Sequence, residues 1–120
     1  MKIHKVLKVW QKSINFVIKI YEETNSFPNS ELYGLTSQLR RAAVSVPSNI
    51  AEGAARNTDK EYVRFLFIAR ASAAEIETQL IIAENLGYIT SIDNQLKEEL
   101  LEISKMLTAL IYKIKQRIIK

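Results

Sequence analysis

Apolar residues recur along this chain at steps of three and four, which is the repeat of one face of an α-helix. The first such stretch covers about residues 5–24, where the apolar stripe consists of Leu7, Trp10, Ile14, Val17 and Tyr21. It ends at residues 25–30, where Asn, Ser and Pro favour turns. The pattern therefore predicts one long helix followed by a short connection.

A second periodic stretch covers about residues 31–56, with a break near Gly34 as one possibility. Its apolar stripe consists of Leu35, Leu39, Ala43, Val46 and Ile50. Pro47 lies inside the stretch, where proline removes one backbone hydrogen bond and crowds the carbonyl of the preceding turn. We therefore expect a helix that is kinked or split near Pro47.

The third and fourth stretches have clear boundaries. Thr58 and Glu61 have the spacing of a capping box at a helix start, and Gly87 is suited to a left-handed helix end. The fourth stretch begins near Ser91 or Asp93 and continues to about residue 118. Its apolar seam alternates steps of four and three, as in a coiled coil: Leu96, Leu100, Ile103, Leu107, Leu110 and Ile114.

Four long helices joined by three short connections predict an all-α fold, an antiparallel up-down-up-down four-helix bundle. The length of 120 residues fits one domain, residues 1–120, and 48% apolar residues are enough for a core. Apolar runs are far shorter than the ~20 residues that span a bilayer. Together with the absence of cysteine, this predicts a cytoplasmic protein without membrane contact.

Residues that usually carry catalysis or bind metals are nearly missing. His4 is the only histidine, cysteine is absent, and the three glycines are isolated, so no triad, zinc set or phosphate loop can be assembled. Glu52 and Glu75 are the remaining candidates for an acid pair, but arginines close to them in sequence are better companions. The sequence predicts no enzymatic activity, no metal and no cofactor.

A line of polar residues runs beside the apolar stripe of the second helix: Gln38, Ser45, Asn49, Glu52 and Arg56. One interpretation is a ligand-binding or catalytic cleft. The other is a hydrogen-bond network between helices that includes Asn49 and Glu52 and has Arg70 and Glu75 of the third helix as partners of the polar line. We favour the network, because buried polar groups need partners and this spacing places them along one seam.

The run LTSQLRRAAVSVPSNIAEGAAR from Leu35 to Arg56 resembles the four-helix-bundle proteins encoded in intervening sequences of bacterial 23S rRNA genes. Residues 62–66, Glu75 and residues 86–89 extend the resemblance, and residues 48–53 are its most distinctive part. The resemblance implies a bacterial protein that forms ring-shaped homo-oligomers, usually pentamers, with no known enzymatic activity. A related group, the accessory variability proteins of diversity-generating retroelements, implies a nucleic-acid enzyme as a partner.

Two helical segments have too little charge for the surface of a monomeric bundle. Residues 42–51 have no charge on any face, and residues 65–69 are apolar all round. We expect partner subunits to cover the exposed part of this surface, in an interface that includes Val44, Ser48, Phe67 and Ile68. The alternative is that a bend at Pro47 buries more of the second helix within one bundle.

The net charge of +4 is concentrated by the predicted topology. The start of the first helix, the end of the fourth and the turn between the second and third lie at one end of such a bundle. We predict a nucleic-acid interface there, formed by Lys5, Lys8, Lys12, Lys113, Arg117 and Lys120. With few obvious exposed aromatic residues, contacts to the phosphate backbone are expected. A solvated polar face is the alternative.

These observations lead to one functional hypothesis and one alternative. The hypothesis is a non-enzymatic homo-oligomer that binds structured RNA or DNA through the basic end of the bundle. The alternative is a protein–protein scaffold or accessory subunit that makes no direct contact with nucleic acid.

Overall fold

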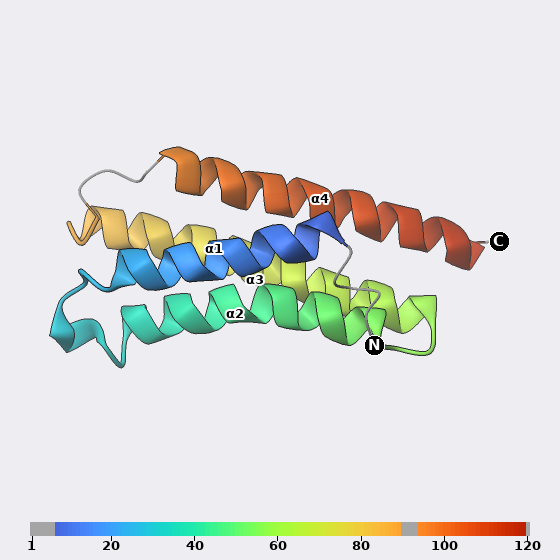
Figure 1. Ribbon diagram of the computed structural model, residues 1–120, viewed down its shortest axis with the longest axis horizontal. Helices are drawn as coiled ribbons and strands as arrows, with labels where there is room; N and C mark the ends of the chain where they lie inside the picture. The colour runs from blue at the N-terminus through green and yellow to red at the C-terminus, as the bar shows by residue number, and fades with distance from the viewer. Residues whose placement is uncertain (1–6, 90–93, 120) are drawn as a thin grey trace.

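A computed structural model describes residues 7–89 and 94–119 of the chain (Figure 1). Its elements are α1 Lys8–Thr24, the short 3-10 helix η2 Asn29–Glu31, α2 Leu35–Ala54, α3 Asp59–Asn85 and α4 Asn94–Ile119. The described residues contain no β-strand. The long helices run alternately up and down, which confirms the predicted all-α antiparallel bundle. The starts predicted for the fourth helix, Ser91 and Asp93, lie outside the described residues.

Each long helix packs against two neighbours. Both α1 and α3 contact α2 and α4, so the four helices enclose one apolar core within a molecule 50 Å long. Leu39, Ile50, Ile103 and Leu107 of the stripes predicted for the second and fourth helices are buried in it, together with Leu66 and Ile76 of α3. The stripe predicted for the first helix is wrong in register: Leu7, Trp10, Ile14 and Val17 are only partly buried and Tyr21 is exposed, whereas Val9, Phe16 and Ile20 are buried. Packing against α2 and α4 decides which side of α1 faces the core. Within the described residues, no helix combines the length and hydrophobicity needed to cross a bilayer.

The connection between α1 and α2 is fastened by Glu31. Its carboxylate accepts hydrogen bonds from the backbone N–H of Leu35 at 3.0 Å and from the Tyr88 hydroxyl at 2.8 Å. The first bond caps the start of α2, which begins directly after Gly34, so the predicted break at that glycine is confirmed. The second bond joins this connection to the chain segment that follows α3.

The helix boundaries agree closely with the capping signals. The Thr58 hydroxyl accepts a hydrogen bond from the Glu61 N–H at 3.1 Å, which fixes the start of α3. Gly87 has φ of +78°, as a left-handed helix end requires. Pro47 is buried inside α2, which continues through it as one helix, so the helix is not split there. The kink near Pro47 stays a prediction.

Candidate nucleic-acid interface

The turn between α2 and α3 and the end of α4 lie at one end of the bundle, and α1 begins on the same side but short of that end (Figure 1). We call this surface the basic end. Its described charged residues are the cations Lys8, Arg56, Lys60, Arg64, Lys113, Lys115 and Arg117 and the acids Glu52, Asp59 and Glu61. Lys12, also predicted for this interface, lies farther from the end, opposite Glu102 in the first half of α4. Two of the predicted interface residues, Lys5 and Lys120, lie outside the described residues.

Two lysines of α1, Lys12 and Lys19, form ion pairs with glutamates of α4. Lys12 forms an ion pair with Glu102 at 2.5 Å, and about two turns of helix further on Lys19 forms an ion pair with Glu99. The hydrogen bond to Glu102 raises the pKa of Lys12. Lys12 and Lys19 are seven residues apart and therefore lie on one face of α1. Their ion pairs join α1 to α4, so the positive charge of Lys12 is already compensated by a carboxylate.

Arg117 also has an acidic partner. Its Nη2 and Nε atoms donate to the two carboxylate oxygens of Asp59, at 2.7 and 3.1 Å. This fork geometry raises the pKa of Arg117 and lowers the pKa of Asp59, mainly through the side-chain hydrogen bonds. The guanidinium has further N–H donors that Asp59 does not use, so Arg117 is oriented by the pair and can still donate to an anion.

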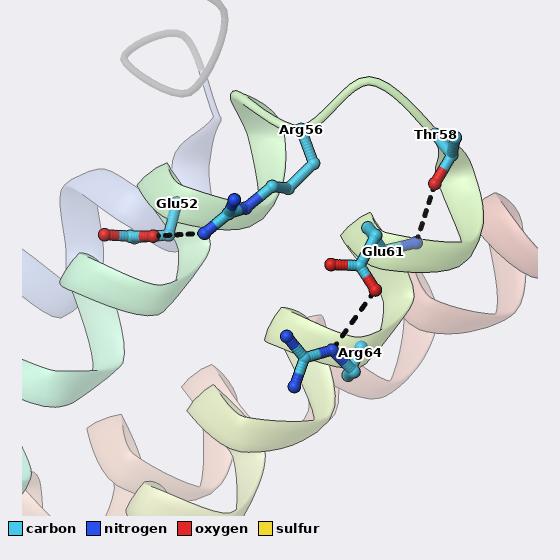
Figure 2. A network of polar contacts seen from close by, with 5 residues as sticks. All are labelled: Glu52, Arg56, Thr58, Glu61 and Arg64. Atoms are coloured by element: carbon cyan, nitrogen blue, oxygen red, sulfur yellow. Dashed lines mark hydrogen bonds and ion pairs between the residues drawn. The ribbon is translucent and has the colours of Figure 1, made fainter.

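The turn between α2 and α3 presents two more arginines (Figure 2). Arg56 donates to Glu52 at 2.9 Å, and Arg64 donates to Glu61 at 3.3 Å. Both guanidinium groups also lie over the ring of Phe65, at 4.5 and 4.9 Å from its centroid. These contacts hold two positive charges in defined positions on the surface, although each charge is partly balanced by its glutamate.

Four cations of the basic end are exposed and have no carboxylate partner among the described residues: Lys8, Lys60, Lys113 and Lys115, the last of which lies over the ring of Phe67. Tyr112, the neighbour of Lys113 in the sequence, is 67% exposed, so one aromatic ring is available for stacking near this end, within the expectation of few exposed aromatic residues. Exposed lysines next to an exposed ring are suited to contacts with phosphates and bases.

Within residues 7–89 and 94–119, no group of three or more His, Cys, Asp or Glu side chains is placed to hold a metal ion. His4, the only histidine, lies outside that part of the chain.

Residues 5–109 match the family described as 23S rRNA-intervening sequence protein. The chain belongs to this family. Its fold is similar to that of a crystal structure described as a protein with unknown function from the S23 ribosomal protein family of Bacteroides thetaiotaomicron. The TM-score is 0.76 and the identity 24%, over 86% of this chain and 97% of the other, a likeness that shows the fold alone. No curated protein gave a significant match.

In this 23S rRNA-intervening sequence protein, the polar seam between α2 and α3 contains part of the predicted network. Asn49 donates to the carbonyl and the hydroxyl of Ser45 at 2.8 and 2.9 Å, and the Ser45 hydroxyl lies 2.9 Å from that of Ser72. Glu75 enters through Gln79, whose amide lies 3.4 Å from it. The spacing found Asn49 but did not reveal Ser72 or Gln79.

Two residues predicted for that network lie elsewhere. Arg70 donates to Thr108 of α4 at 3.2 Å and lies over the ring of Phe67, so it belongs to the opposite side of α3. Glu52 pairs with Arg56 one turn along α2 rather than with α3. Helical spacing places residues on a face, but the choice of neighbour depends on the packing of whole helices, which explains both differences.

The four residues predicted for the oligomer interface are all exposed, but they do not face one way. Val44 and Ser48 follow each other on the outer side of α2. Phe67 lies on the α4 side of α3, where Lys115 and Arg70 cover its ring. Consecutive residues of a helix diverge by about 100°, so Ile68 points to another side of α3.

Proposed function

We propose that this protein is a non-enzymatic homo-oligomer that binds nucleic acid, either structured RNA or DNA, through the basic end of its bundle. The observation that carries the proposal is the excess of cations over acids at that end, with Lys8, Lys60 and Lys113 exposed and free of carboxylate partners among the described residues. Repetition of the surface in an oligomer would multiply its charge and its phosphate contacts.

The arginines and the lysines of the basic end would have different roles in binding. Arg117, Arg56 and Arg64 are held by Asp59, Glu52 and Glu61, so these side chains are oriented before a ligand arrives. The unpaired lysines then supply charge that a phosphate can neutralise without breaking an existing pair. Tyr112 provides an exposed ring beside Lys113 for an unpaired base.

The experiment measures binding of nuclease-treated, purified protein to a labelled RNA hairpin and to duplex DNA over a range of salt concentrations. The test variant combines Lys8→Glu and Lys113→Glu, since neither lysine has an ion-pair partner whose loss would disturb the fold. Lys97→Glu, an exposed lysine near the other end of the bundle, is the matched control.

Binding that weakens steeply with salt supports the proposal. The double variant should bind less tightly and should lower the slope of log affinity against log salt by about two, one for each lost phosphate contact. The Lys97→Glu protein should behave like the wild type apart from a small effect of net charge. No binding at low salt, or equal loss in both variants, would overturn the proposal.

The same experiment addresses the alternative of a protein–protein scaffold. That alternative is favoured by the ion pairs of Lys12 and Arg117, since they neutralise two of the cations that sequence spacing assigned to nucleic acid. An intact oligomer that binds neither RNA nor DNA would make the scaffold the better description.

A further inference from the structure

We propose that the groove between α3 and α4 binds an amphipathic helix of a partner protein, with an apolar stripe and carboxylates beside it. This surface is separate from the basic end, and the inference does not depend on nucleic-acid binding.

The groove exists because small side chains face each other along its centre. Ala73 and Ala74 of α3 and Ser104 of α4 line the groove, and the space left is about 500 Å³, compared with about 300 Å³ between α1 and α4 and about 370 Å³ between α2 and α3. Leu80 and Leu100 form part of an apolar floor that is almost fully buried. Small residues let another helix approach closely.

The rims of the groove are apolar and exposed. Ile81 of α3 is 46% exposed and Leu101 of α4 is 55% exposed, and both line the same groove. Two large aliphatic side chains on opposite walls of one groove resemble the anchoring positions of helix-in-groove recognition. A partner helix would bury them by placing its own apolar stripe between them.

The charges around the groove indicate which kind of helix fits. Arg70 and Lys97 line it at two positions along its length, against one acid, Glu77. Neither cation pairs with a carboxylate among the described residues; Arg70 donates only to the Thr108 hydroxyl and stacks on Phe67. An occupant with carboxylates beside its apolar stripe would satisfy both cations.

The groove between α1 and α4 provides the contrast. It also contains two cations, Lys12 and Lys19, but each of these pairs with a glutamate of α4. Its positive charge is thus compensated within the chain, whereas that of the α3–α4 groove is not.

The probe is a labelled synthetic helix with leucines at positions i, i+3, i+4 and i+7 and glutamates beside them. Two control peptides have lysine in place of glutamate, or the same residues in scrambled order. Fluorescence anisotropy gives the affinity of each for the wild-type protein. We expect the glutamate peptide to bind at least about ten-fold more tightly than either control.

Protein variants locate the site. Leu101→Glu should weaken binding of the glutamate peptide about ten-fold or more. Ile18→Glu is the matched control, since Ile18 is 54% exposed in the α1–α4 groove, and it should leave the affinity unchanged. Combining Arg70→Glu with Lys97→Glu should reverse the preference, so that the lysine peptide binds better than the glutamate peptide.

Several results would overturn the inference. These are no binding of the glutamate peptide, equal binding of the glutamate and lysine peptides, or equal loss in the Leu101→Glu and Ile18→Glu proteins. A smaller particle mass for Leu101→Glu than for the wild type would show that a second copy fills the groove instead. Combined Lys8→Glu and Lys113→Glu should retain peptide binding, so failure of this inference and failure of the proposed nucleic-acid function are distinguishable.

Discussion

Arg117, near the end of α4, donates two hydrogen bonds to Asp59, the first residue of α3, one to each oxygen of its carboxylate. The two residues are 58 positions apart in the chain. The pair therefore joins the end of α4 to the start of α3. It lies beside the surface proposed to bind nucleic acid.

The Asp59–Arg117 pair predicts a loss of stability in acid. Because Arg117 lowers the pKa of Asp59 in the folded state, the stabilisation is complete above the ordinary carboxyl pKa of about 4 and is lost as the pH falls through the lowered value. Glu31 contributes in the same direction, since its hydrogen bonds from Leu35 and Tyr88 lower its pKa.

Thermal unfolding followed by circular dichroism measures this effect for the wild type and Asp59→Asn. The variant should have a lower Tm at pH 7, and the difference should shrink as the pH falls below about 4. Glu61→Gln is the control, because Glu61 lies in the same first turn of α3 but contacts Arg64 instead. A difference in Tm that stays constant down to pH 2 would contradict the explanation.

The fold was predictable because it depends on local periodicity. The apolar stripes identified the helices, and Thr58 and Gly87 identified the start and end of α3 by local backbone chemistry. The break before Leu35 followed from Gly34 in the same way. Each of these signals lies within a few residues of the feature that it predicts, so no knowledge of packing was needed.

The site was less predictable because it depends on contacts between helices. Spacing placed Lys12 and Lys19 on one face of α1, but only the register of α1 against α4 brings Glu102 and Glu99 opposite them. Arg117 was identified as a cation without its partner for the same reason. Asp59 offered a signal, as an acid in the first turn of a helix, but that position has a sufficient local explanation in the helix dipole.

Gly53 lies where α2 packs closely against α3, so a larger residue at this position should disturb the packing of the two helices. A Cβ atom at this position would lie 2.9 Å from both Phe65 Cβ and Tyr62 Cδ1, and 3.1 Å from the Tyr62 carbonyl oxygen. Alanine normally stabilises a helix relative to glycine, but here α3 would have to move away. We expect Gly53→Ala to lower the free energy of unfolding by ~1–3 kcal/mol.

Urea unfolding tests this expectation, with Ser48→Ala on the exposed side of the same helix as control. The control should change stability by less than ~0.5 kcal/mol. A Gly53→Ala protein as stable as the wild type would mean that the helices adjust without cost.

Gln79 is a buried polar residue whose removal should not destabilise the bundle. It is 5% exposed, its amide nitrogen makes only long contacts of 3.4 Å to Gln38 and Glu75, and its Oε1 has no hydrogen-bond partner among the described residues. An unpaired buried acceptor costs ~1–3 kcal/mol, whereas Gln38 and Glu75 remain solvated.

Gln79→Met, which is close in shape, should therefore leave the free energy of unfolding unchanged or raise it by up to ~1 kcal/mol. The measurement is again urea unfolding, and Gln38→Met at the exposed partner is the control. A loss of more than ~1 kcal/mol in Gln79→Met would instead indicate that the amide is well satisfied in solution.

The final prediction concerns the assembly of subunits and tests whether the interface includes the exposed surface around Val44 of α2 or the one around Phe67 of α3. Val44 is 40% exposed on the outer side of α2 beside Ser48, so Val44→Glu would place a charge in the proposed subunit interface. We expect multi-angle light scattering to give a smaller particle mass for this variant, whereas Val44→Thr should keep the mass of the wild type.

Phe67→Glu should behave differently from Val44→Glu. Lys115 and Arg70 lie over the ring of Phe67, so a carboxylate introduced there would find two cations of its own chain and remain compensated. The particle mass should then stay close to that of the wild type. If the mass falls for Phe67→Glu but not for Val44→Glu, the interface lies on the α4 side of α3; if neither changes it, neither surface joins subunits.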